Sequence, residues 1–218
     1  MRLTHAVMVI ADISGYTNFI TNRNVSLLHA EQIITDLLES MVDRTEHPLI
    51  LNKLEGDAAF LYAESGDDHA AAANNALIQV AALFPAFYQR LDRIRQDRSH
   101  CGCDACAKVG NLKLKAFVHC GEIAVKQFRQ FEELAGEDVI LIHRLMKNKV
   151  EGHEYVLLTA PIYWAVPTVT PLGQVHHEEF DGVGMLDLLR LAPAELASVT
   201  DTARARADSM LASPGSLP

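Results

Sequence analysis

An uncharged run of aliphatic residues near the start of the chain constrains the fold most strongly. Residues 3–13 read LTHAVMVIADI, and Asp12 is the first acidic residue of the chain. A run of this kind is typical of a strand that is buried on both faces of a sheet. Asp12 therefore lies at the carboxyl end of a predicted central strand, and Ser14 and Gly15 can turn the chain into a short helix.

The rest of the chain alternates between helical and strand patterns. Helices are predicted at 26–47 with Ser26 as its cap, at 66–98, where Pro85 bends or splits the helix, and at 136–149. Strand pairs are predicted at 112–128 and 175–191. A strand that enters a short helix is predicted at 154–166. A hairpin is predicted at 49–64, with its turn at Glu55, Gly56 and Asp57.

This order of elements predicts an α+β fold with a central, mostly antiparallel sheet and flanking helices. We expect one domain over 1–192 and a C-terminal extension over 193–218, partly helical and partly disordered, because its composition turns to Ala, Ser, Thr and Arg. The net charge of -9 disfavours nucleic acid and anionic membrane as partners. No apolar run approaches the roughly 20 residues that span a bilayer, and no signal-peptide cleavage site follows the first strand, so we expect a cytoplasmic protein.

Three of the four cysteines crowd into the segment CGCDAC, while the fourth stands alone. In a reducing cytosol neighbouring thiols are more often free or metal-bound than cross-linked. The spacing is not that of a standard zinc finger, so a structural zinc ion, free thiols and a redox pair all stay open. The candidate zinc ligands are His100, Cys101, Cys103, Cys106, His119 and Cys120.

Two carboxylates stand out by position, Asp12 at the end of the buried strand and Asp57 at the hairpin tip. Hard divalent cations take oxygen ligands, and carboxylates on strand ends beside outward-facing amides suit a magnesium-triphosphate complex. Position alone does not decide this, because an Asp at a strand end is more often a turn-former.

Four segments resemble the catalytic domains of class III nucleotidyl cyclases. ADISGYTNF resembles the first metal-binding strand of that family, and KLEGDAAFLY resembles its second metal hairpin. LKAFVHCGEI is similar to the strand that precedes the dimer-facing hairpin, and GEDVILIHRLMK to the helix that supplies transition-state groups. The segments keep the family's order and intervals over roughly residues 3–190. The resemblance implies a ferredoxin-like cyclase fold and a homodimer with its sites across the interface.

In this family the ribose 3′-oxygen attacks the α-phosphate of a nucleoside triphosphate and pyrophosphate leaves, with two magnesium ions stabilising the charge. The resemblance implies that Asp12 and Asp57 hold Mg²⁺ or Mn²⁺, with the Ile13 carbonyl assisting. The backbone amides implied to cradle the phosphates are those of Ser14, Gly15, Tyr16 and Thr17.

Three further residues fall on nucleotide-binding positions of the resembled family. Lys53 aligns with the lysine that reads the purine, Glu133 with an acid that accepts from the adenine amino group, and Arg144 with the catalytic arginine at the α-phosphate. Glu133 is one methylene longer than the usual acid. A solvated strand lysine and a helix-terminal arginine that serves the helix dipole are the alternative interpretations of Lys53 and Arg144.

Two positions depart from the family pattern. Ile140 stands where the family has an asparagine that orients the ribose, and the loss of such a contact can cost about 100-fold in rate. Asp181 or a neighbouring acid stands where the family has a lysine for the terminal phosphates. The sequence therefore predicts a divergent cyclase-like protein that binds a nucleoside triphosphate, ATP being favoured over GTP, with weak or absent conversion to cyclic AMP. The alternatives are a non-catalytic nucleotide-binding or dimerisation module and a purely structural dimer.

Overall fold

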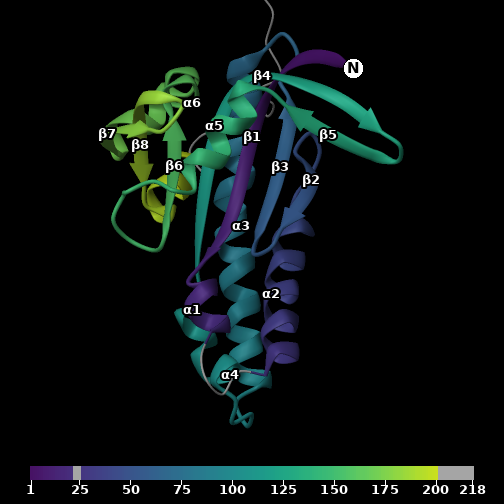
Figure 1. Ribbon diagram of the computed structural model, residues 1–218. Helices are drawn as coiled ribbons and strands as arrows, with labels where there is room; N and C mark the ends of the chain where they lie inside the picture. The colour runs from purple at the N-terminus through teal and green to yellow at the C-terminus, as the bar shows by residue number, and fades with distance from the viewer. Residues whose placement is uncertain (22–25, 201–218) are drawn as a thin grey trace, which may run out of the picture.

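One eight-stranded sheet organises the chain in the computed structural model, which describes residues 1–21 and 26–200 (Figure 1). The strands follow the order β2-β3-β1-β4-β6-β8-β7, and β5 pairs with β4 outside this path. Every pairing is antiparallel except that of β4 with β6. The strand bounds are β1 (Arg2–Ser14), β2 (Ile50–Glu55), β3 (Ala58–Glu64), β4 (Lys113–Phe128), β5 (Phe131–Ala135), β6 (Tyr155–Thr159), β7 (Gln174–Phe180) and β8 (Gly184–Leu191).

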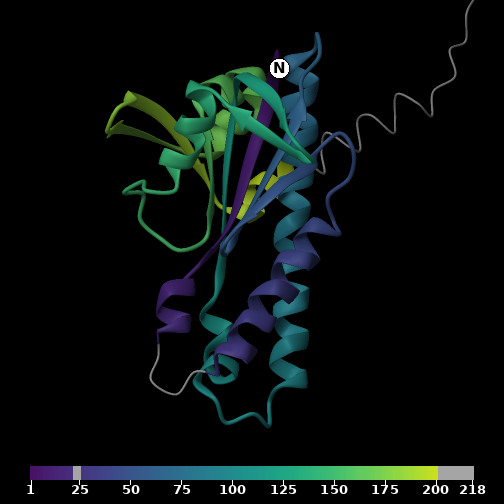
Figure 2. The same cartoon turned by 45° about the vertical axis from the view of Figure 1, so that its right-hand side comes forward.

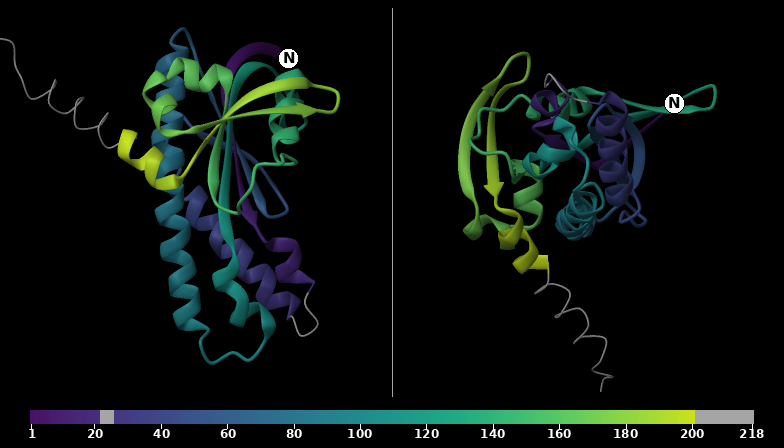
Figure 3. Two further views of the ribbon diagram at one scale, coloured as in Figure 1. Left: turned by 90° about the vertical axis from the view of Figure 1, so that its left-hand side faces the viewer. Right: turned by 90° about the horizontal axis from the view of Figure 1, so that it is seen from below.

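Helices cover both faces of this sheet, as the rotated view in Figure 2 shows. The long helices α2 and α3 pack on one face, and α5 packs on the other. A further helical stretch over 193–200 lies beside α3 (Figure 3). The helix bounds are α1 (Tyr16–Ile20), α2 (Leu27–Val42), α3 (His69–Asp97), α4 (Asp104–Lys108), α5 (Glu137–Leu145) and α6 (Ala160–Ala165), with 3₁₀ turns η1 (Val109–Asn111) and η2 (Pro167–Leu172).

The central strand β1 is buried on both faces, as its uncharged sequence predicts. Val7, Val9 and Ala11 face the core under α2 and α3, because alternate residues of a strand point to the same side. Met8 and Ile10 face the second core, beneath α5. Asp12 continues this second series, so its side chain lies on the α5 face of the sheet.

Two segments differ from the sequence predictions. The helix α3 continues through Pro85 without a break, because Phe84 and Phe87 on either side are held in the core. The strand β4 runs through Gly121 as one strand of 16 residues, since its pairing with β1 is continuous from Lys113 to Val125. The second strand of that hairpin is β5.

The predicted cap of α2 is confirmed, and an acidic residue caps α3. The Ser26 hydroxyl accepts from the backbone N–H of His29 at 3.4 Å, and the Asp68 carboxylate accepts from Ala71 at 2.8 Å. The expected extension is helical over 193–200, and its remainder lies outside the described residues.

One described helix, α3, is long and apolar enough to cross a membrane by length and composition. Core helices pass the same test. Its buried face, from Ala72 to Ile94, packs against the sheet and α2, so we assign it to the core.

We predict that Gly121→Ala lowers the free energy of unfolding by about 2–4 kcal/mol. An added Cβ would stand 2.1 Å from the Asp138 carboxyl group, which lies 2.9 Å from the His119 ring and accepts from a β4 amide. The substitution must displace this carboxylate from its buried partner. Urea denaturation of the wild type and the variant measures the loss.

The matched control is Gly110→Ala, where the new Cβ would meet the Arg95 side chain at the ordinary contact distance of 3.5 Å. This variant should change the free energy of unfolding by less than about 1 kcal/mol. Equal losses in the two variants would show that the Asp138 contact does not explain the requirement for glycine at 121.

Candidate functional site

The end of β1 and the tip of the β2–β3 hairpin meet at one edge of the sheet. Asp12 stands opposite Ala58 in the β1–β3 pairing, and the Ile13 N–H donates to the Asp57 carbonyl at 3.1 Å. Gly56 turns the hairpin with a φ of 65°, a left-handed conformation that favours glycine. The structure therefore brings Asp12 and Asp57 together, although 45 positions of sequence separate them.

Both carboxyl groups are half-buried, and burial raises the pKa of each. Burial is the main cause that raises the pKa of Asp12 to about 6, and the neighbouring Asp57 charge contributes to this rise. Burial also raises the pKa of Asp57. Two carboxylates held close in a partly desolvated place repel each other, so the pair favours a proton or a cation.

Lys115 of β4 stands directly opposite Asp12 in the sheet, and it was not among the predicted site residues. The two residues are direct neighbours in the β1–β4 register, and Lys115 lowers the pKa of Asp12. Burial lowers the pKa of Lys115 itself, and its Nζ lies 4.8 Å from the centroid of the Tyr155 ring. The strand alternation of LKLKAFV was the available signal, because it puts Lys115 on the same face as Phe117.

A cavity of about 290 Å³ opens beside the turn after β1. Gly15 takes a φ of 95° there, and the buried Ser14 places its Oγ 3.4 Å from His153 Nδ1. The Tyr16 hydroxyl donates to Glu31 of α2 at 3.0 Å, which directs that side chain toward α2. The Thr17 carbonyl accepts a hydrogen bond from the Thr21 hydroxyl. The cavity is lined by Ser14, Gly15, Asn18, Phe19, Lys108, Asn111, Leu112 and His153.

The predicted base-reading residues lie together, although Lys53 is on β2 and Glu133 is on β5, two strands that do not pair with each other. Lys53 Nζ is 3.8 Å from Glu133 Oε2 and 3.4 Å from Glu55 Oε1. Glu55 in turn lies 3.0 Å from the Nε2 atom of His143 on α5. Glu55 and His143 were not among the predicted residues, and the signal for Glu55 is its two-residue spacing from Lys53 on one face of β2.

Arg144 lies on α5, in a separate hollow of about 380 Å³. It makes no ion pair with any residue in the described part of the chain, and Ile140 beside it is 57% exposed. Asp181 lies in the exposed turn between β7 and β8. The Arg144 hollow shares no lining residue with the cavity at Ser14.

The largest of these cavities, about 460 Å³, lies against the outer side of α3. Arg44, Pro85 and Gln89 are among its lining residues. None of the residues that sequence reasoning singled out for metal or nucleotide lines it, so its volume does not make it the candidate site.

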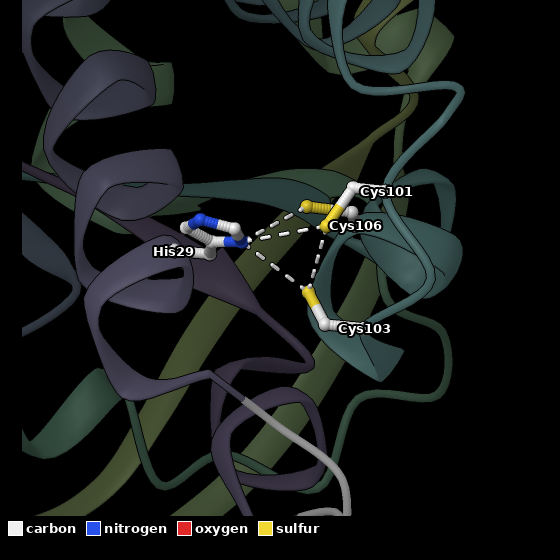
Figure 4. Close-up of side chains that lie close together, drawn as sticks. All are labelled: His29, Cys101, Cys103 and Cys106. Carbon is white, nitrogen blue, oxygen red and sulfur yellow. Dashed lines mark hydrogen bonds between the residues drawn. The ribbon is translucent and has the colours of Figure 1, made fainter.

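The crowded cysteines gather around a histidine from α2 (Figure 4). The sulfur atoms of Cys101 and Cys103 each lie 3.5 Å from His29 Nδ1, and that of Cys106 lies 3.7 Å from it. His29 was not predicted as a ligand, because 72 positions separate it from Cys101.

The other three candidate zinc residues stay outside this group, which corrects the expected ligand set. Both ring nitrogens of the buried His119 have partners, Thr159 Oγ1 at 2.8 Å and Asp138 Oδ1 at 2.9 Å. Burial raises the pKa of Cys120 to about 11. His100 is not part of the group, whereas the side chain of the adjacent Cys101 reaches His29 of α2.

Comparison with known proteins places this arrangement in a family. A family model described as "Protein of unknown function (DUF2652)" matches residues 34–155. The chain belongs to the DUF2652 family. "Uncharacterized protein Rv2561/Rv2562" of Mycobacterium tuberculosis (strain ATCC 25618 / H37Rv) is 35% identical to this DUF2652 chain over 156 residues, 69% of each chain.

Solved structures confirm the predicted fold of this DUF2652 protein. The adenylyl cyclase CyaB from P. aeruginosa superposes with a TM-score of 0.67 at 14% identity, over 87% of this chain and 95% of that one. A class III adenylyl cyclase-like ATP-binding protein from Pseudomonas aeruginosa gives a TM-score of 0.61 at 15% identity, over 78% of this chain and 36% of that one. The chain has the fold of class III cyclase catalytic domains, and likeness at such identities carries no statement about chemistry.

We predict that Asp12→Asn stabilises the protein at pH 8 and not at pH 4, in buffer without Mg²⁺ or Mn²⁺. The Asp12 pKa rises from 3.8 to about 6 on folding, so the stability that this group contributes is present below pH 3.8 and is lost as the pH rises through 6. Asparagine removes that loss, which corresponds to about 1–3 kcal/mol at pH 8. Urea denaturation at both pH values measures it.

The control is Asp67→Asn, which changes an exposed acid in the turn before α3. It should give no pH-dependent gain of this size. A gain from Asp12→Asn that is equal at pH 4 and pH 8 would contradict the raised pKa.

Proposed function

We propose that this protein binds a nucleoside triphosphate together with Mg²⁺ or Mn²⁺ and converts it to a cyclic mononucleotide slowly or not at all. The observation that carries the proposal is the meeting of Asp12 and Asp57 at one sheet edge, with the Ser14–Gly15 turn directly after Asp12. Carboxylates would hold the cation, and the cavity beside the turn offers room for phosphates.

The electrostatics of the pair support a divalent ion there. Each carboxyl group has a raised pKa through burial, and the repulsion between the two falls when a cation binds between them. Hard cations such as Mg²⁺ and Mn²⁺ prefer carboxylate and carbonyl oxygens. The backbone carbonyl of Ile13 is the third oxygen that the class III resemblance assigns to such an ion. When bound, the ions would stabilise charge on the phosphates.

The placement of Arg144 supports a site that is completed by a second copy of the chain. Arg144 and Ile140 face an open hollow on α5, apart from the cavity at Ser14. Phe128 and Phe131 form a cross-strand pair near the tip of the β4–β5 hairpin and are 65% and 57% exposed. Large aromatic side chains exposed side by side are typical of an interaction surface, so we include a homodimer in the proposal.

Two features favour nucleotide binding over rapid turnover. Ile140 offers no hydrogen bond in the Arg144 hollow, where the class III family has a ribose-orienting asparagine. Asp181 in the β7–β8 turn would repel the terminal phosphates that a lysine binds in that family. The Pseudomonas aeruginosa protein of the same fold, described as cyclase-like and ATP-binding, is a precedent for this combination.

Lys53 supports ATP as the first nucleotide to test. Its ammonium group lies within 4 Å of Glu133, so a hydrogen-bond donor and an acceptor stand together at the place assigned to the base. An adenine edge needs this pairing of donor and acceptor, whereas Lys53 alone would serve either purine.

We expect calorimetry to detect binding of ATP in the presence of Mn²⁺ and to detect clearly weaker binding for Asp57→Ala. Loss of that carboxylate removes one of the two acidic groups that would hold the cation, and the affinity should fall at least about tenfold. A non-hydrolysable ATP analogue should bind the wild type equally. GTP in place of ATP tests the purine preference.

Asp67→Ala is the matched control, since it removes an exposed acid of the same type and should bind like the wild type. Absence of heat with ATP and GTP for folded wild-type protein would overturn the proposed function. Full affinity of Asp57→Ala would refute the metal assignment while leaving nucleotide binding in place.

We expect Ile140→Asn to raise the rate of cyclic AMP formation from Mn²⁺ and ATP by about 10- to 100-fold, because it restores an orienting hydrogen bond to the ribose. Product quantification by mass spectrometry measures the rate. Ile140→Ala removes the same apolar side chain without adding a hydrogen bond and should leave the rate near that of the wild type. An equal rise in both variants would show that the bulk of the isoleucine, rather than the lost hydrogen bond, limits turnover.

A further inference from the structure

We propose that His29, Cys101, Cys103 and Cys106 form a structural zinc site that fastens the segment between α3 and β4 to the start of α2. Their ligand atoms all lie within 4.8 Å of one another (Figure 4). The site is separate from the Asp12–Asp57 pair in both residues and chemistry. It uses three sulfur atoms and one imidazole nitrogen, a donor set that favours Zn²⁺ over Mg²⁺ or Mn²⁺.

The distances fit a tetrahedral zinc ion. With Zn–S near 2.3 Å and Zn–N near 2.1 Å, a tetrahedron sets the nitrogen about 3.6 Å from each sulfur and the sulfurs about 3.8 Å apart. The observed separations from His29 Nδ1 are 3.5, 3.5 and 3.7 Å, and Cys101 and Cys103 are 3.6 Å apart. Four of the six distances between the ligand atoms therefore match those around a tetrahedral zinc ion, and all six are within 4.8 Å.

Hydrogen bonds alone do not account for this arrangement. A neutral imidazole has one ring nitrogen with a free lone pair, which can accept from one thiol at a time. Three sulfur atoms nevertheless surround the same Nδ1 atom of His29. A cation at the centre explains why all four groups converge, because each would direct one lone pair at it.

The ligands are carried by fixed parts of the backbone. His29 lies in the first turn of α2, where its N–H donates to the Ser26 cap. Cys103 caps α4, and the buried Cys106 lies within that helix. The Cys101 N–H donates to the carbonyl of Arg98 at the end of α3. Such support holds the ligand atoms near one geometry before a metal arrives.

The surrounding charge suits a zinc ion with three thiolates, which together carry a net charge of -1. The guanidinium group of Arg98 lies within hydrogen-bonding reach of Cys106, and its Nη2 donates to Gln32 of α2 at 3.2 Å. Four protein ligands leave no open position for substrate, so the site is structural. Zinc would displace one proton from each thiol to solvent, with no change of oxidation state.

The proposed zinc ion would hold one wall of the cavity beside Ser14. Lys108, Asn111 and Leu112 of that wall follow Cys106 directly in the chain, through the end of α4 and through η1. The zinc ion would thereby fix this wall relative to α2. Any effect on nucleotide affinity rests on the proposed function, whereas zinc binding itself does not.

The experiment measures zinc in protein purified under reducing conditions after expression with added zinc, without nucleotide. We expect about one zinc ion per chain in the wild type, and a loss of at least about tenfold in His29→Ala and Cys103→Ser. Cys120→Ser is the matched control, because this fourth cysteine lies outside the group, and it should keep its zinc. Circular dichroism of each variant shows whether it is folded.

A second measurement covers variants that do not fold. Wild-type protein stripped of metal and loaded with Co²⁺ should show the intense visible bands of a tetrahedral thiolate complex, and zinc should abolish them at one equivalent per chain. Folded wild-type protein without bound zinc and without these bands would overturn the proposal. A disulfide between two of the three cysteines in freshly purified wild-type protein, or equal zinc loss in Cys120→Ser, would overturn it too. Absence of ATP binding would leave the zinc result unaffected.

Discussion

The candidate site depends on the antiparallel pairing of β1 with β3, because this pairing brings two acidic side chains to one end of a buried sheet. The pairing runs without interruption from Ala6 to Asp12 and ends where the hairpin turn begins. Apolar packing on both faces holds the two strands in this register. The register in turn keeps Asp12 next to Asp57 and out of bulk water, at an electrostatic cost that the apolar packing of the strands offsets.

A proton on Asp12 and the Lys115 side chain both reduce the repulsion within that pair, and the proposed divalent cation would compete with them. Lys115 is fixed opposite Asp12, yet burial disfavours its charge, so its compensation of the acidic pair is incomplete. Below pH 6 a proton on Asp12 relieves the repulsion. Above that pH the deprotonated pair has the larger need for a cation. The same burial that destabilises the charged pair would therefore favour the proposed divalent cation at neutral pH.

Much of the fold was predictable from the sequence because hydrophobic periodicity reports burial directly. The two-sided burial of β1, the cap of α2 and the hairpin about Asp57 all followed from local patterns. Of the two outcomes predicted for Pro85, a split of the helix does not occur, since packing of its neighbours overrides the helix-breaking tendency of proline in this place. His29 could not be found from local spacing at all, because its contact with the cysteines depends on how α2 packs against α4.

The two proposed metal sites would bind different classes of cation, because their ligand atoms differ. Oxygen ligands at the end of β1 suit a hard cation, whereas sulfur ligands near Cys103 suit a soft or borderline one. Magnesium would therefore not displace zinc from the cysteines, and the cysteines would not bind the magnesium that the carboxylates prefer. Because α4 and η1 connect the cysteines to the cavity at Ser14, a zinc ion held by the cysteines would keep the wall of that cavity in place, while the proposed nucleotide and its cations could exchange there.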